Sequence, residues 1–368
     1  MNETLNTDCV ELVELVLNHW TTLAQEGQKL CEDKAKAAGL ESALRLCHML
    51  NVTTGFVKDD LQWSKRYLFK NPQSPFPALI GQHNFRRKDR SKGAGRVQPP
   101  PGIRPVNGNC PFCNYQWQQF GTEICYRYTV ANEDLIALPN AFPFGELHFT
   151  HAAAVHRPQA WHSPGRDATV ANLHQRIVCA VEHAALTPER VIFVNDESAG
   201  ASITAHFHLQ SLLRPDGYGY WPLEIAATQT RGQAATAEAL LVGAYPIAAV
   251  YWCGAKERVF RLACNWIERW LDASGWKPTL RLHIIASARI DDPECIQLFI
   301  VPRDSRYPNS QRMVGTVGSL EVLGEFVFCT DDELKMLMNG QINHTTAVEI
   351  LASVEPRGQR EVLARICP

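Results

Sequence analysis

The sequence predicts an α+β protein, and three observations lead to this fold class. Apolar residues recur at helical spacing in the N-terminal segment, whereas from Cys110 onward short β-branched runs alternate with amphipathic stretches. The chain has 368 residues, of which 45% are hydrophobic and 20% charged, so it can bury a core of ordinary size. Its longest apolar run, 239–255, contains Gly243 and Pro246 and is too short for a membrane span, so we expect no membrane partner.

Residues 1–70 are predicted to form a helical cap. A first helix is expected over Asp8–Gln25 and a second over Glu41–Leu50. One face of the first helix is apolar, with Val10, Val13, Val16, Leu17 and Trp20 at helical spacing. Such a stripe packs against a protein core more often than against a membrane, so we predict a packing role for this segment.

Residues 71–109 are predicted to form a loop rich in proline and glycine. The loop carries a basic cluster of Arg86, Arg87, Lys88, Arg90 and Lys92. The cluster is either a solvated surface or a strap that meets substrate phosphates, and the sequence leaves both open. Phe85 is the aromatic residue in this cluster, and the formal net charge of the chain is -2. Few aromatic residues and no net positive charge are unusual for a nucleic-acid-binding surface, so we do not expect nucleic acid as a partner.

The segment 110–329 is predicted to be the catalytic domain, and 330–368 a C-terminal helical segment. Helices are expected over Asp167–Ala185 and Lys256–Ala273, and another begins at Thr330. Strands are expected over Tyr126–Leu138, Leu147–Val155, Arg190–Asn195, His206–Leu213, Pro246–Trp252, Leu280–Ala288 and Gln297–Val301.

The strand over His206–Leu213 carries the pattern with the clearest chemistry. Alternate side chains of a strand share a face, so His206, His208 and Gln210 line up while the residues between them pack behind. A largely neutral imidazole is a good nucleophile toward phosphorus, and the phosphoramidate that it forms breaks down again. The alternative is an ordinary strand with two half-buried histidines. The preceding small-residue turn, 200–202, makes the catalytic interpretation more specific.

Cys110 and Cys113 have the spacing with which two thiolates grip one tetrahedral zinc ion. Two more ligands are needed, and the candidates are His156 and His206. Rivals for the third position are His148, His151 and His162. A redox role for the two thiols is the competing interpretation, although no thioredoxin-like strand and helix surround them.

Asn140 begins a turn in which Phe142 and Phe144 flank a proline. The two rings suit an apolar wall for a nucleobase. A plain turn between two core strands is the alternative, and composition does not separate them.

Taken together and in this order, the three motifs resemble the histidine-triad superfamily in its galactose-1-phosphate uridylyltransferase-like branch. The resemblance covers residues 105–305 and implies an antiparallel sheet flanked by helices. Residues 221–224 and 243–247 are similar to the GDP-L-galactose and GDP-D-glucose phosphorylases. The diadenosine tetraphosphate phosphorylases share the small-residue turn and the following histidines. The cysteines favour the uridylyltransferases, whereas the downstream segments favour the phosphorylases.

The resemblance implies a role for each motif residue. His208 matches the nucleophile, Gln210 the glutamine that stabilises the intermediate, and Ser202 a phosphate-binding serine. Ser202 lies four residues before the first histidine where the family usually has three, so Thr204 is the alternative donor. Asn140, Phe142 and Phe144 match the nucleotide pocket, and Cys110, Cys113, His156 and His206 match a structural zinc site.

The sequence therefore predicts a nucleotidyltransferase with a covalent nucleotidyl-histidine. Its substrate would be a nucleoside diphosphate sugar or related dinucleotide, and its acceptor inorganic phosphate or a sugar phosphate. Arg303 and Arg306 are additional candidates for contacting the phosphoryl oxygens. The alternative is that both side chains are solvated at the surface. A hydrolase and a non-catalytic, zinc-stabilised nucleotide-binding protein are the alternatives. The acidic N-terminus and scattered cysteines lead us to expect a cytoplasmic protein, and related folds suggest a homodimer.

Overall fold

The computed structural model describes residues 4–57, 61, 64–89, 107, 110–113, 124–214, 219–233 and 239–367. Within these ranges, the side chains of 4–21, 88–89 and 232–233 are not described. The predictions for the apolar stripe of the first helix, for the side chain of Lys88, and for Arg90 and Lys92 therefore lie outside the described part.

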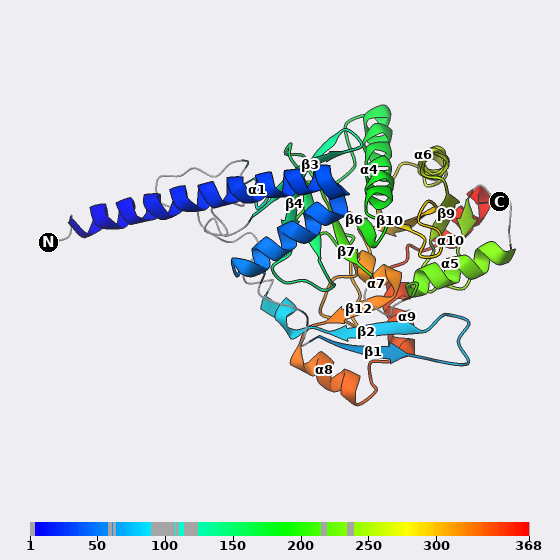
Figure 1. Ribbon diagram of the computed structural model, residues 1–368. Helices are drawn as coiled ribbons and strands as arrows, with labels where there is room; N and C mark the ends of the chain where they lie inside the picture. The colour runs from blue at the N-terminus through cyan, green and yellow to red at the C-terminus, as the bar shows by residue number, and fades with distance from the viewer. Residues whose placement is uncertain are drawn as a thin grey trace.

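Within the described residues, a nine-stranded antiparallel sheet forms the centre of the chain (Figure 1). Its strand order is β3-β4-β5-β7-β6-β10-β11-β9-β8. The predicted α+β class with an antiparallel sheet and flanking helices is thereby confirmed. The strands are β3 (Tyr126–Val130), β4 (Glu133–Pro139), β5 (Phe149–Ala153), β6 (Arg190–Asn195), β7 (His208–Leu213), β8 (Leu240–Leu241), β9 (Val250–Gly254), β10 (Leu280–Ala288) and β11 (Ile296–Asp304).

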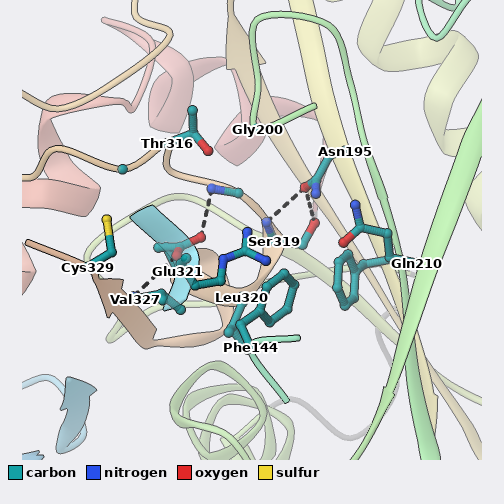
Figure 2. A pocket seen from close by; sticks show the side chains of 14 residues that line it. Phe144, Asn195, Gly200, Gln210, Thr316, Ser319, Leu320, Glu321, Val327 and Cys329 are labelled. Atoms are coloured by element: carbon teal, nitrogen blue, oxygen red, sulfur yellow. Dashed lines mark hydrogen bonds between the residues drawn. The ribbon is translucent and has the colours of Figure 1, made fainter. Parts of the chain in front are cut away.

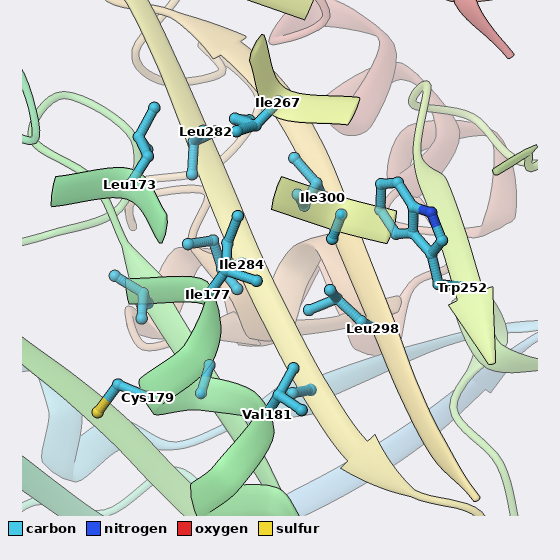
Figure 3. Close-up of a cluster of buried hydrophobic side chains, with 14 of the residues drawn as sticks. Leu173, Ile177, Cys179, Val181, Trp252, Ile267, Leu282, Ile284, Leu298 and Ile300 are labelled. Atoms are coloured by element: carbon cyan, nitrogen blue, oxygen red, sulfur yellow. The ribbon is translucent and has the colours of Figure 1, made fainter. Parts of the chain in front are cut away.

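One face of this sheet is covered by α4 (Arg166–Leu186) and α6 (Lys256–Ala273), with α10 (Gln359–Ile366) beside α6. Figure 3 shows Leu173 and Ile177 of α4 beside Leu282 and Ile284 of β10. Because strand side chains alternate, this cluster takes every second residue of each central strand, and the remaining residues face the other side. The buried apolar area of this cluster is a principal source of the stability of the domain.

The opposite face carries a second layer. A second apolar cluster lies in this layer. It contains Val191 and Phe193 of β6 together with residues of α5 (Pro222–Gln233) and α7 (Ser319–Leu323). A three-stranded sheet belongs to the same layer, in the order β1-β2-β12. Its strands are β1 (Lys65–Phe69), β2 (Leu79–His83) and β12 (Glu325–Phe328). Three short helices are η1 (Phe85–Asp89), α8 (Asp331–Met338) and α9 (His344–Ser353).

The N-terminal segment α1 (Thr4–Thr53) consists of two helices joined at a kink. Ala38 and Gly39 have non-helical backbone angles there, and Gly39 has a φ of 81°, which suits glycine. Leu44 and Cys47 of the second helix pack against Tyr126 and other residues at the β3 edge of the large sheet. Two helices are present, as predicted, but the first continues to the kink at Ala38 and does not end near Gln25.

Three local predictions were wrong. The single strand expected over Tyr126–Leu138 is the β3–β4 hairpin, because Ala131 and Asn132 both adopt positive φ and close a two-residue turn. The loop expected over 71–109 contains β2 and η1, and the helical segment 1–70 contains β1. β2 pairs with β12, which lies far away in the sequence, so local composition carried no signal for it.

The other long elements lie close to their predicted bounds. Thr330 caps α8, as predicted, because its hydroxyl accepts from the Glu333 N–H while the Glu333 carboxylate accepts from the Thr330 N–H. None of the helices in the described ranges is long and apolar enough to cross a lipid bilayer.

Candidate functional site

His208 is the first residue of β7, between β5 and β6 in the centre of the large sheet. Phe207 and Leu209 belong to the apolar cluster under α4, whereas Gln210 lines a cavity on the other side. The alternation predicted for this segment is therefore present. Strand pairing starts two residues later than predicted, because His206 lies in the bend before β7. The imidazoles of His206 and His208 both pack against Phe112, with ring centroids 5.5 and 5.1 Å away.

The His208 ring has a defined tautomer. Its Nδ1 lies 3.0 Å from the carbonyl oxygen of His206, which can only accept a hydrogen bond. Nδ1 therefore carries the proton in the neutral ring, and the lone pair that can attack an electrophile is on Nε2.

Gln159 holds the backbone of His208 from both sides. Its Oε1 accepts from the His208 N–H at 2.8 Å, and its Nε2 donates to the His208 carbonyl at 3.1 Å and to the Asn195 carbonyl. Gln159 is fully buried, and Arg176 donates to its backbone carbonyl. Sequence reasoning did not identify Gln159, because nothing in the local pattern distinguishes it from a surface glutamine.

Cys110, Cys113, His156 and His206 form one cluster, as predicted for a metal site. Their donor atoms all lie within 4.8 Å of one another. The distance between donor atoms is 3.3 Å for Cys110–His206, Cys113–His156 and His156–His206, and 3.5 Å for Cys113–His206. Ligands about 2.0–2.3 Å from a tetrahedral ion lie roughly 3.3–3.8 Å apart. The cluster therefore has the size of a tetrahedral metal site.

The groups around the cluster fit the same interpretation. The Nε2–H of His206 donates to the Ala153 carbonyl at 2.7 Å, which leaves Nδ1 facing the two sulfur atoms. Asn107 donates to the Cys113 sulfur at 3.2 Å. Burial lowers the pKa of His206, which favours the neutral ring that ligates metals.

The rival histidines lie elsewhere. His148 is hydrogen-bonded to Gln210. His151 is hydrogen-bonded to Tyr128 and Ser211 inside the sheet. His162 faces the carbonyl of Leu280.

The turn at 140–144 leads from β4 toward the cavity. The Asn140 Oδ1 accepts from the Phe142 N–H at 3.0 Å, so this side chain shapes the turn. Phe144 lines the cavity, and its ring centroid is 4.0 Å from that of His148. Phe142 is half-buried and contributes its carbonyl to Arg87. Of the predicted pocket residues Asn140, Phe142 and Phe144, only Phe144 lines the cavity.

Arg87 connects the predicted basic cluster to this cavity. It lies in η1, its guanidinium is 4.7 Å from the Phe144 ring centroid, and it lines the cavity. Arg86 beside it is exposed. The position of Arg87 thus fits the interpretation in which the basic cluster meets substrate phosphates. The position of Arg86 fits the interpretation in which the cluster is a solvated surface.

The cavity has a volume of about 110 Å³ and lies between β6, β7 and the segment before α7 (Figure 2). Gln210 is 3.1 Å from His148 through its Oε1, so its amide NH₂ is the part that can donate to a ligand. The lining residues are Arg87, Phe144, Phe193, Asn195, Gly200, Gln210, Gly315, Thr316, Gly318, Ser319, Leu320, Glu321, Val327 and Cys329.

Asn195, at the end of β6, has a fixed amide orientation. Its Oδ1 accepts from the Ser319 N–H at 2.8 Å and from the Ser319 hydroxyl at 2.7 Å (Figure 2). It also accepts from His283 Nδ1 at 3.0 Å. Burial keeps the pKa of His283 well below its usual value, so the ring is neutral and its Nε2 accepts from Arg303 at 2.7 Å. Asn195 and Ser319 were missed by sequence reasoning, because 124 residues separate them.

Arg303, a predicted phosphate contact, is fully buried behind this network and is not among the lining residues. It donates to the carbonyls of Val317, Tyr307 and Pro308, so it supports the cavity wall. Arg306 is exposed and paired with Asp304. Ser202 and Thr204 are exposed in the loop before His206 and do not line the cavity.

Gly200, in that loop, packs directly against the segment before α7. It has a φ of 89°, and an added Cβ would lie 2.5 Å from the Gly318 Cα. We expect Gly200→Ala to lower the free energy of unfolding by about 3 kcal/mol, because it combines left-handed strain with a backbone overlap. Urea unfolding measures this. Gly243→Ala, where a Cβ meets nothing within 4 Å, is the matched control. Equal midpoints for the two variants would contradict the prediction.

No protein-family model matches this chain, and no curated protein sequence does. Three solved structures of yeast Ap4A phosphorylase Apa2 are similar in fold. The complex with Ap4A has a TM-score of 0.53 at 14% identity over 84% of this chain and 95% of that one. A second structure of the same enzyme has a TM-score of 0.53 at 13% identity over 84% of this chain and 92% of that one. The AMP complex has a TM-score of 0.52 at 14% identity over 85% and 97%.

At this identity the likeness establishes the fold. It agrees with the diadenosine tetraphosphate phosphorylase part of the predicted resemblance and gives no support to the uridylyltransferase branch. The chain thus has the fold of the Ap4A phosphorylase Apa2.

Proposed function

We propose that this chain is a phosphorylase that transfers a nucleotidyl group from a phosphoanhydride substrate to inorganic phosphate through His208. The observation that carries the proposal is the His208 ring, whose proton is on Nδ1. His208 is the first residue of β7, and Gln210, two residues further along the same strand, lines a cavity with Phe144 and Phe193 in its wall. The likeness to yeast Ap4A phosphorylase favours a dinucleoside polyphosphate. A nucleoside diphosphate sugar is the second substrate class, favoured by the motifs at 221–224 and 243–247.

The reaction has two displacements. In the first, His208 Nε2 attacks the α-phosphorus, a P–N bond forms, and the P–O bond to the leaving nucleotide or sugar phosphate breaks. In the second, an oxygen of inorganic phosphate attacks the same phosphorus, the P–N bond breaks, and a nucleoside diphosphate leaves. The His206 carbonyl stabilises the Nδ1–H as positive charge develops on the ring. The Gln210 amide and Arg87 are the donors placed to stabilise charge on the phosphoryl oxygens.

We further propose that the four-residue cluster holds a structural zinc ion. Two thiolates and two imidazoles are a typical zinc set, and four protein ligands leave no position for a reactive water. Zinc at this site would fix His206, whose carbonyl accepts the Nδ1–H of His208. The metal site would thus act on catalysis by positioning the nucleophile.

Intact-mass spectrometry tests the proposal. The full-length protein is incubated briefly without phosphate with diadenosine tetraphosphate and, separately, with GDP-hexoses. We expect a nucleoside monophosphate adduct that is lost in acid, as a phosphoramidate is, and that maps to tryptic peptide 191–231, which contains His208. Added inorganic phosphate should discharge it as a nucleoside diphosphate.

Other outcomes identify the alternatives. An acid-stable adduct would place the bond on a residue other than histidine. Discharge to water alone would support the hydrolase. Nucleotide binding without any product over hours would support the non-catalytic protein and overturn the proposal.

A further inference from the structure

Two cysteines outside the candidate site lie in direct contact at the β9 side of the large sheet. Cys253 is in β9 and Cys295 immediately precedes β11, and their sulfur atoms are 2.8 Å apart. The two strands pair with Cys253 opposite Gln297, so Cys295 lies diagonally across on the same face. Both are free thiols and both are half-buried, so a small solute can reach them.

The surroundings of Cys253 favour its thiolate. The Cys295 thiol donates to it, the Tyr251 hydroxyl and Arg231 add to the effect, and together they lower its pKa to about 6 against the opposing effect of burial. Arg231 donates to its sulfur at 3.1 Å. A thiolate is the nucleophilic form of cysteine, so Cys253 is the thiol that attacks and Cys295 the one that resolves.

Four of the other described cysteines lack this combination. Burial raises the pKa of Cys179 and of Cys264 to about 12. Cys31 and Cys47 are neighbours but are fully buried.

We propose that Cys253 and Cys295 form a reversible disulfide when the protein meets a peroxide. The Cys253 thiolate attacks one peroxide oxygen, so that an S–O bond forms, the O–O bond breaks and water leaves after protonation. The Cys295 thiol then attacks the Cys253 sulfur. The S–S bond forms, the S–O bond breaks and a second water leaves. The dithiol has given two electrons to the peroxide, and an excess of a small thiol returns them.

The geometry asks for little rearrangement. A disulfide is about 2.05 Å long, so the two sulfur atoms approach by less than about 1 Å. Cys295 precedes the first residue of β11, where the chain is exposed on its N-terminal side. The bond would close a covalent loop between residues 42 apart and tie β9 to the β10–β11 hairpin.

Peptide mapping tests the proposal with the full chain. The zinc-loaded protein is treated with a small excess of hydrogen peroxide, alkylated, and digested with trypsin without reduction. We expect peptide 232–256 linked to peptide 290–303, each of which contains a single cysteine, so the assignment is unambiguous. The linked mass should disappear after dithiothreitol, and the unfolding midpoint of the oxidised protein should rise by a few degrees.

The variant Cys295→Ser separates the two steps. It should stop at a Cys253 sulfenic acid that dimedone traps, whereas Cys253→Ser should give neither trapped product nor linked peptide. Cys264 in peptide 262–269 is the matched control and should stay alkylatable throughout. Two results would overturn the proposal. One is full alkylation of both cysteines after peroxide treatment, and the other is oxidation of Cys253 to the sulfinic acid with Cys295 still free.

Discussion

A His208→Gln variant is expected to lose phosphorolysis activity by at least about 10⁴-fold, because it removes the nucleophile of the first displacement. Without the nucleotidyl-histidine, the second displacement cannot take place either. The glutamine amide can still donate to the His206 carbonyl, so the strand should keep its geometry. Binding of the donor nucleotide should change little, since the cavity is lined by other residues. The measurement is phosphate-dependent cleavage of whichever donor forms the adduct, followed by nucleotide chromatography.

His174→Gln is the control for this experiment. His174 is a half-buried histidine of α4 that faces the Cys264 carbonyl, away from the cluster and the cavity. It undergoes the same chemical change and should retain activity. Activity of His208→Gln within tenfold of the natural chain would show that another residue takes up the nucleotidyl group.

A Cys113→Ser variant is expected to lose the bound metal and to unfold at least about 5 °C below the natural chain, because structural zinc contributes directly to folding. Elemental analysis of the purified protein should give about one zinc ion per natural chain and a small fraction of that for the variant. Activity should fall as well, because His206 would no longer be fixed beside His208. Calorimetry and the adduct assay measure the two effects separately.

Cys264→Ser is the matched control, since it removes a half-buried thiol outside the cluster. It should keep both its zinc and its melting temperature. Equal zinc content in the two variants would show that the cluster does not bind the ion. An alternative test leaves the sequence unchanged: treatment with a chelator should lower the melting temperature, and added zinc should restore it.

The sequence by itself determined the long elements and the motif chemistry. Helical periodicity places α4 and α6, and β-branched runs place β6 and β10, because each element buries one face whatever its neighbours are. Strand alternation separates Gln210 from Phe207 and Leu209 in the same way. The spacing of Cys110 and Cys113 made a metal site foreseeable, since short-range ligand spacing is a local property.

Only the tertiary structure decided which distant residues meet. Among several histidines it brought His156 and His206 to the cysteines. It buried Arg303 behind the cavity and placed Arg87 in its wall. The Asn195–Ser319 contact spans 124 residues, and such contacts depend on the register of whole strands. A register is set by the packing of all layers at once, so local composition and periodicity carry no record of it.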